Sequence, residues 1–215
     1  MAGMECTTIH GLTTTVDEDR EGDLASLNLG LIRASSISED FSHLEGIWSP
    51  PPLGVLKINS DGSSRGNPGH AGIGGVGRDS SGDVQFIFSE YKGLHTNNLM
   101  EAQAILVAME RANQLGWRRI ICESDSQVVV NLLKRQYMDN VSWQLALIVE
   151  QILTLCASLE HVTFNHIPRE WNGVADCLAK WASDHMHDWN LVDRGHLPPD
   201  LSHQLDHLVD LDRAI

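Results

Sequence analysis

The chain has 215 residues, of which 42% are hydrophobic, so it is long enough for one ordinary domain with extensions and can bury a core. Its net charge of −14 is unusual for a protein that binds a polyanion, but nine acidic residues lie within 1–53 and seven within 184–215. No apolar run approaches the ~20 residues that cross a membrane, and the four separated cysteines form no zinc-binding pattern, which argues against membrane and zinc proteins.

The N-terminal segment indicates an intracellular protein. Its first residues, MAGMECTTIHGLTTT, lack the basic start and apolar run of a secretory signal, and two arginines among nine acids in 1–53 argue against a transit peptide. We therefore expect a nuclear or cytoplasmic location. Residues 1–53 are predicted to be an acidic, largely disordered extension that ends in the Pro-rich stretch WSPPPL.

A pattern typical of an α/β domain occupies residues 54–183. Alternating apolar residues predict an antiparallel meander of three strands, VLKINSD (55–61), HAGIGGVGRD (70–79) and VQFIFSEYKG (84–93). Helical periodicity and capping residues then predict helices and two further strands, in the order helix 97–116, strand 118–125, helices 126–136 and 142–159, strand 161–168 and helix 170–183. We expect a five-stranded mixed sheet with helices packed on it, followed by an acidic tail over 184–215.

Four carboxylates stand at notable places in this pattern. Asp61 and Asp125 end the first and fourth predicted strands, where binding sites gather in open sheets. Glu101 shares a helix face with four apolar residues, and Asp176 lies in a mostly apolar helical stretch. A buried carboxylate is costly unless a cation compensates for its lost hydration. The apolar neighbours of Glu101 are Ala104, Ile105, Ala108 and Met109.

Each of these acids also has an ordinary structural explanation. Asp61 before Gly62 is a common turn, Asp125 before an apolar helix is a common cap, and Glu101 and Asp176 are compatible with the edges of amphipathic helices. As a set, however, the four acids have no cysteine or histidine companions. Oxygen ligands alone favour a hard cation, Mg²⁺ or Mn²⁺, over zinc.

Four stretches carry a family resemblance: SDGSSRGNPGHAGIGGV, TNNLMEA, ESDSQVVV and EWNGVADCLAK, in this order. Together they resemble type 1 ribonuclease H, which cuts the RNA strand of RNA–DNA hybrids. The match is closest to plant ribonuclease H-like domains that resemble the C-terminal domain of non-LTR retroelement reverse transcriptases. The resemblance covers about 54–183 and implies a ribonuclease H-like fold, a hybrid nucleic acid as the partner and a monomeric enzyme.

The resemblance assigns roles to particular residues. It implies that two Mg²⁺ (or Mn²⁺) ions are held by Asp61, Glu101, Asp125 and Asp176, and that they activate a water and stabilise the leaving 3′ oxygen. It also implies that a glycine-rich loop over residues 62–72 approaches the RNA strand, where small polar groups meet the 2′-hydroxyls. The implied substrate contacts are Gly62, Ser63, Ser64, Gly66, Asn67, Asn97, Asn98, Ser126 and Gln127. Helix capping is the alternative explanation for the two asparagines at 97 and 98.

The sequence departs from the family in two respects. The basic helical handle of many members is reduced here to KRQYMDNVS, with only Lys134 and Arg135, which predicts weak and salt-sensitive binding of the hybrid. The family's loop histidine, thought to assist catalysis, has His166 as its counterpart, although Pro168 shortens the loop and His166 is equally suited to ending the strand. Arg169 is a candidate phosphate contact.

Three alternative functions fit the sequence less well. A retroelement-derived nucleic-acid-binding domain with weak or no catalytic activity is disfavoured by the presence of all four acids. Other nucleases of this fold begin with Asp-x-Glu, whereas position 63 is Ser, and integrases lack the GNPG and TNN elements. A protein-interaction domain explains none of the acids.

Overall fold

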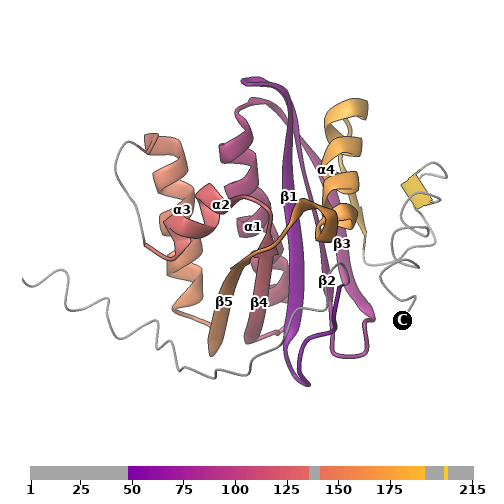
Figure 1. The fold of residues 1–215 in the computed structure, drawn as a ribbon, viewed down its shortest axis with the longest axis vertical. Coiled ribbons are helices and arrows are strands. Elements are labelled where there is room, and N and C mark those ends of the chain that lie inside the picture. The colour runs from indigo at the N-terminus through magenta and orange to yellow at the C-terminus, as the bar shows by residue number, and fades with distance from the viewer. Residues whose placement is uncertain (1–47, 136–140, 192–200, 203–215) are drawn as a thin grey trace, which may run out of the picture. The chain divides into compact units, whose positions relative to one another are not determined.

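The fold is built on one mixed sheet, seen edge-on in Figure 1. This computed structural model describes residues 48–135, 141–191 and 201–202. Within them the strand order is β5-β4-β1-β2-β3-β6. The pairs β1–β2, β2–β3 and β3–β6 are antiparallel, and β1–β4 and β4–β5 are parallel. The bounds are β1 Leu56–Gly66, β2 Gly69–Arg78, β3 Val84–His95, β4 Arg119–Ser124, β5 His161–His166 and β6 Trp189–Leu191.

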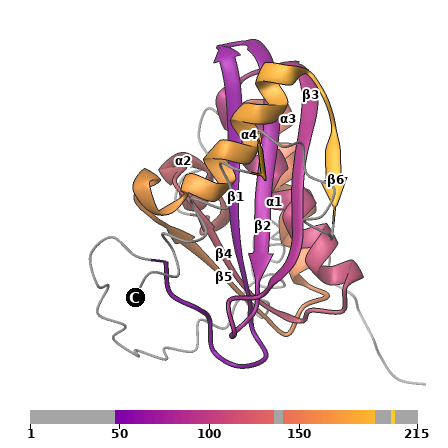
Figure 2. The ribbon, with the colours of Figure 1, turned by 90° about the vertical axis from the view of Figure 1, so that its right-hand side faces the viewer.

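Helices cover both faces of the sheet (Figures 1 and 2). On one face α1 (Asn97–Gln114), α2 (Gln127–Leu133) and α3 (Trp143–Cys156) bury the larger apolar cluster against the strands. On the other face α4 (Gly173–His185) builds a smaller cluster around Leu178 and Trp181. A short 3₁₀ turn, η1 (Arg169–Trp171), leads into α4. No helix in the described parts of the chain combines the length and apolar character needed to cross a membrane.

The predicted α/β architecture is confirmed, with one correction to the sheet. All five expected strands form, but the sheet has six, because β6 pairs with β3 in the register Ile87↔Leu191 and Ser89↔Trp189. A three-residue edge strand held by backbone pairing leaves no alternating pattern in the sequence. Leu201, which also lies in the segment assigned to the acidic tail, is buried against the α4 side of the sheet. Residues 1–47 of the extension predicted over 1–53 lie outside the described residues.

The glycine-rich stretch after Asp61 is mostly strand, which corrects the expectation of a loop over residues 62–72. β1 continues through Gly66, and only Asn67 and Pro68 separate it from β2. Of the glycines between positions 62 and 72, only Gly66 has a positive φ, of 101°. At Gly62 the need is for space, since an added Cβ would lie 2.3 Å from the backbone nitrogen of Glu101. This glycine lets α1 approach the sheet closely.

Gly74 of β2 gives α4 the same close approach to the sheet that Gly62 gives α1. A Cβ on Gly74 would lie 2.4 Å from the backbone nitrogen of Ala179 and 2.5 Å from Cβ of Leu178. We expect Gly74→Ala to lower the free energy of unfolding by about 2 to 3 kcal/mol, because a helix backbone has to shift to admit the methyl group. Urea denaturation measures the effect. The control is Gly75→Ala, whose Cβ would meet mainly the ring edge of Phe88, at 2.6 Å. Equal losses in the two variants would contradict this explanation.

Candidate metal and nucleic-acid site

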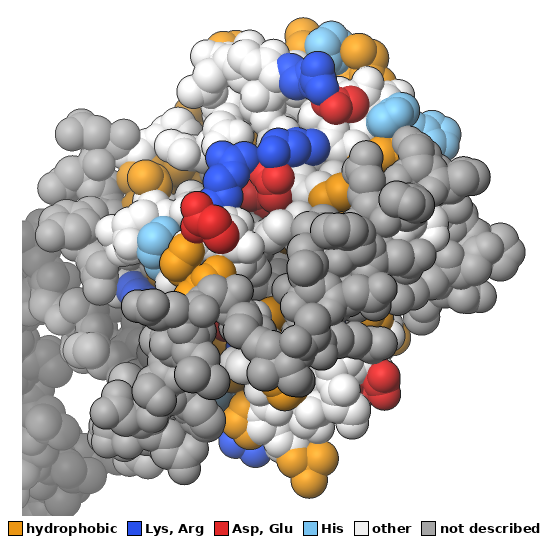
Figure 3. Space-filling model, turned by 45° about the vertical axis from the view of Figure 1, so that its right-hand side comes forward, with side chains coloured by type: hydrophobic (Ala, Val, Ile, Leu, Met, Phe, Trp, Pro, Cys, Tyr) orange, Lys and Arg blue, Asp and Glu red, His pale blue; other side chains and the backbone are white. Residues whose placement is uncertain are grey.

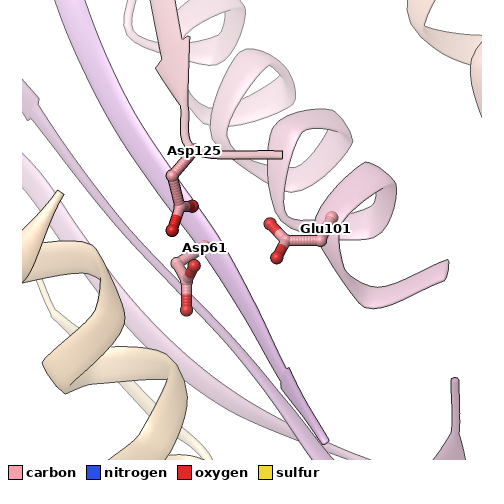
Figure 4. Close-up of side chains that lie close together, drawn as sticks. All are labelled: Asp61, Glu101 and Asp125. Atoms are coloured by element: carbon pink, nitrogen blue, oxygen red, sulfur yellow. The ribbon is translucent and has the colours of Figure 1, made fainter. Parts of the chain in front are cut away.

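Three carboxylates from separate elements converge beside the middle of β1, at the point where the neighbouring strand β4 ends (Figure 4). Asp61 comes from β1, Glu101 from the second turn of α1, and Asp125 from the junction between β4 and α2. One oxygen of each lies within 4.8 Å of the others. The parallel register Asn59↔Glu123 explains the meeting of the two aspartates, since each lies two residues further along its strand direction.

The helix α1 brings Glu101 to this point with its apolar stripe against the sheet. Its predicted neighbours Ala104, Ile105, Ala108 and Met109 are all fully buried. Glu101 itself is only 6% exposed, and its Oε2 accepts a hydrogen bond from the backbone N–H of Gly62 at 3.2 Å. The absent side chain at Gly62 therefore admits the helix, and this close approach lets the Gly62 N–H orient the Glu101 carboxylate.

Burial and mutual repulsion disfavour negative charge on these acids. Burial, and then the charges of Glu101 and Asp125, raise the pKa of Asp61 well above its ordinary value. Burial and the charge of Asp125 raise the pKa of Glu101 to about 8, although the Gly62 hydrogen bond opposes this shift. A divalent cation would remove this repulsion, and three carboxylates without histidine or cysteine are the donor set that a hard cation prefers. The residues thus fit a Mg²⁺ or Mn²⁺ site.

A fourth buried acid nearby is already neutralised. Glu123 lies 3.1 Å from Lys57 Nζ and accepts a hydrogen bond of 3.0 Å from the amide of Asn59. Trp48 in turn donates its indole N–H to Asn59 at 3.1 Å. Because Glu123 has its partners inside the fold, it differs from the three clustered acids, and we assign it a structural role.

Asn172 is a site residue that the sequence reasoning did not single out. It is 1% exposed, and its amide Nδ2 donates to Oδ1 of Asp125 at 3.1 Å and to the carbonyl of Ser60 at 3.0 Å. Asn172 therefore connects β1 and the Asp125 carboxylate just before α4 begins. The only signal in the sequence was the asparagine of the EWNGVAD motif itself.

Asp176 lies outside the three-acid cluster in this structure. Its Oδ1 is 2.7 Å from Nη2 of Arg169, and its Oδ2 is 2.6 Å from Nζ of Lys180. Both residues expected to bind separate ligands, Asp176 a metal and Arg169 a phosphate, therefore contact each other. The hydrogen bond and charge of Asp176 raise the pKa of Arg169.

His166 ends β5, as one of the two interpretations of the sequence allowed. Its Nε2 lies 3.2 Å from the backbone carbonyl oxygen of Asp125. Since a carbonyl only accepts, this nitrogen donates, and it is not available as a base in this arrangement. His166 is exposed, so its ring borders the carboxylate site from outside.

The expected substrate contacts fall into two groups. One lies on the β1–β2 hairpin and the start of α1, which are joined by a 3.2 Å hydrogen bond from the Asn97 N–H to Oδ1 of Asn67. Asn97 and Asn98 are exposed, and no side chain caps α1, whose N-cap residue is Thr96. The other group begins α2. The first group is Gly62, Ser63, Ser64, Gly66, Asn67, Asn97 and Asn98, and the second is Ser126 and Gln127.

The three hydroxyls among these residues already have partners in the fold, and Ser63 Oγ accepts from Ser183 Oγ at 3.4 Å. Ser126 caps α2 by accepting from the N–H of Val129, at 3.5 Å. Ser64 donates to the carbonyl of Gly66 at 2.6 Å, and its oxygen also lies 2.7 Å from the carbonyl of His95. These side chains therefore stabilise the segments that surround the carboxylates. No disulfide joins the three cysteines of the described residues, which are Cys122, Cys156 and Cys177.

Comparison with known proteins identifies relatives of this domain. The sequence pattern of the reverse transcriptase-like family matches residues 59–182. An Arabidopsis thaliana protein named for ribonuclease H is 35% identical over 152 residues, which are 67% of this chain and 24% of that protein. Ribonuclease HI of Halobacterium salinarum is 33% identical over 141 residues, 66% of this chain and 70% of that protein. The chain thus spans about a quarter of the plant relative.

Solved structures show the same fold. The crystal structure of RNase H1 from Halobacterium salinarum superposes with a TM-score of 0.59 and 31% identity, over 61% of this chain and 98% of that one. LC11-RNase H1, solved in complex with an RNA/DNA hybrid, gives a TM-score of 0.57 and 32% identity, over 61% and 98% of the two chains.

Proposed function

The chain belongs to the reverse transcriptase-like family, whose relatives include ribonucleases H, and from this membership we propose that it hydrolyses the RNA strand of RNA–DNA hybrids. The observation that carries the proposal is the convergence of Asp61, Glu101 and Asp125, each of which offers an oxygen within 4.8 Å of the others. The cluster is assembled from β1, α1 and the β4–α2 junction of the shared fold.

We assign the metal ions of this reaction to the carboxylate cluster. Two Mg²⁺ or Mn²⁺ ions, held by Asp61, Glu101 and Asp125 with Asp176 as a further ligand, would supply positive charge to the scissile phosphate and lower the pKa of an attacking water. The acids are ligands and not nucleophiles. Gly62 orients Glu101 through its N–H, and Asn172 orients Asp125 through its amide.

The groups that surround the cluster suit recognition of an RNA strand. The hairpin between β1 and β2 and the start of α1 present exposed amides at Asn67, Asn97 and Asn98, and α2 begins with the exposed Gln127. Amides and backbone groups bind 2′-hydroxyls, which only the RNA strand of a hybrid carries. We propose that the protein binds the hybrid as a monomer inside the cell.

A panel of duplexes tests the substrate class. We expect cleavage of the RNA strand in an RNA–DNA hybrid and none in double-stranded DNA of the same sequence, because the latter has no 2′-hydroxyl to bind. Each duplex is incubated with protein and Mg²⁺ at several salt concentrations, with each strand labelled in turn. Equal cleavage of hybrid and DNA would contradict the proposed selectivity. A folded protein that binds the hybrid but leaves it intact would favour the binding-domain alternative.

A further inference from the structure

Both carboxylate oxygens of Asp176 are occupied by cations. Arg169 contacts Oδ1 and Lys180 contacts Oδ2, at 2.7 and 2.6 Å. The side chain of Asp176 is 17% exposed, whereas those of Arg169 and Lys180 are 64% and 51% exposed. The acid is therefore fixed in the fold, while its two partners are long surface side chains that can exchange it for another anion. We call these three residues the Asp176 clip.

The clip lies within electrostatic range of the carboxylate cluster. The charge of Asp176 contributes to the raised pKa values of Asp61 and Glu101. In the reverse direction, the charges of Asp61 and Asp125 contribute to the raised pKa of Arg169. Asn172, which contacts Asp125, immediately precedes α4, and Asp176 lies in the first turn of this helix. Asp176 is thus coupled through its charge to the cluster as well as to its two cationic partners.

Three basic side chains in the described part of the chain, Arg65, Arg169 and Lys180, pair with acids of α4. Arg65 at the end of β1 pairs with Asp184, one turn or more beyond the clip. On the face drawn in Figure 3, blue basic side chains accordingly lie against red acidic ones. In this state the surface beside the cluster offers little free positive charge to a phosphate backbone, and the chain carries −14 overall.

We propose that Arg169 and Lys180 are exchanged between Asp176 and the phosphates of the substrate, so that metal and hybrid strengthen each other's binding. When Asp176 turns to a divalent ion at the cluster, the two cations lose their carboxylate and bind phosphate. When a phosphate takes Arg169 and Lys180, Asp176 is freed to bind the ion. The two effects are equal, because coupling between binding sites is reciprocal. This inference rests on the proposed function and adds a positioning role for Lys180.

Hybrid binding without metal tests whether Asp176 withholds Arg169 and Lys180 from the phosphates. In EDTA, Asp176→Asn should free both cations and make hybrid affinity fall about tenfold more between 50 and 200 mM salt than in wild type, as two added phosphate contacts predict. The extra salt dependence should vanish in Asp176→Asn/Arg169→Gln/Lys180→Gln. Glu150→Gln, an equal charge change on an exposed position of α3, is the control. Fluorescence anisotropy gives the affinities, and a salt dependence equal to that of Glu150→Gln would overturn the clip.

Metal binding without nucleic acid tests whether Arg169 and Lys180 withhold Asp176 from the metal ion. By calorimetry, Arg169→Gln/Lys180→Gln should bind Mn²⁺ about threefold to tenfold more tightly than wild type, because Asp176 is released from two exposed ion pairs. In the Asp176→Asn background this gain should fall to about twice, on a logarithmic scale, that of Arg65→Gln, which reports the general effect of removing one positive charge. A gain that persists without Asp176 would overturn the inference and leave the proposed function intact. Absence of Mn²⁺ binding by wild type would overturn both.

Discussion

Asp61→Asn is expected to abolish cleavage while making the metal-free protein more stable. The substitution removes a central ligand, and loss of several kcal/mol of charge stabilisation at the phosphate slows the reaction at least about a thousandfold. At the same time it removes a buried charge whose pKa is raised by burial and by Glu101 and Asp125. We expect the melting temperature in EDTA to rise, since the repulsion among Asp61, Glu101 and Asp125 is relieved.

The cleavage rate and the melting temperature are measured on the same protein sample. The rate is measured on a labelled hybrid with Mg²⁺, and the melting temperature by calorimetry in EDTA at pH 7.5. Glu123→Gln is the matched control, since this buried acid is already paired with Lys57 at 3.1 Å. Its loss should destabilise the fold, because Lys57 is left buried without its partner. An Asp61→Asn protein that unfolds while wild type stays folded would show that Asp61 is structural.

The stability of the metal-free protein is expected to fall as pH rises from about 5 to 8. The pKa of Glu101 in the folded protein is about 8, above its ordinary value of 4.5. The folded state therefore holds a proton on Glu101 that the unfolded chain releases, so the contribution of Glu101 to stability is fully present below pH 4.5 and is lost as pH rises towards 8. We expect a drop in melting temperature of about 5 °C or more across this range in EDTA.

Saturating Mg²⁺ should remove most of this pH dependence, because the ion replaces the protons as the partner of the carboxylates. Glu101→Gln should flatten the profile in EDTA as well. Other groups also titrate in this range, so the informative quantity is the difference between wild type and Glu101→Gln. A wild-type melting temperature that stays constant or rises from pH 5 to 8 in EDTA would contradict the raised pKa values.

The local features of the sequence predicted the core of the site well. Glu101 shares its helix face with Ala104, Ile105, Ala108 and Met109, and a period of 3.6 residues leaves that face only the sheet to pack on. Asp61 and Asp125 follow two predicted strands, and the parallel pairing of β1 with β4 brings them together, although β1 continues past Asp61 to Gly66. Periodicity and strand order are enough to place these three acids near one another.

Features that depend on tertiary contacts were not predictable in this way. The glycine pattern after Asp61 predicts a loop, whereas the structure shows that Gly62 and Gly74 leave room for the backbones of α1 and α4. A sequence does not tell which backbone approaches a glycine. The pair Asp176–Lys180 has the spacing of a helical ion pair, yet the contact with Arg169 depends on the 3₁₀ turn before α4. The strand β6 depends on backbone pairing alone.

Metal-dependent cleavage of a hybrid tests the central claim most directly. A hybrid with labelled RNA and DNA strands is incubated with wild type or Asp125→Asn, in Mg²⁺, Mn²⁺ or EDTA, at low and physiological salt. We predict that wild type with a divalent ion shortens the RNA strand only, leaving 3′-hydroxyl ends that a polymerase extends, and that EDTA or Asp125→Asn stops the reaction. Folded wild-type protein that leaves the RNA intact with both ions, or cuts it equally in EDTA, would contradict the assignment of Asp61, Glu101 and Asp125 as a catalytic metal site.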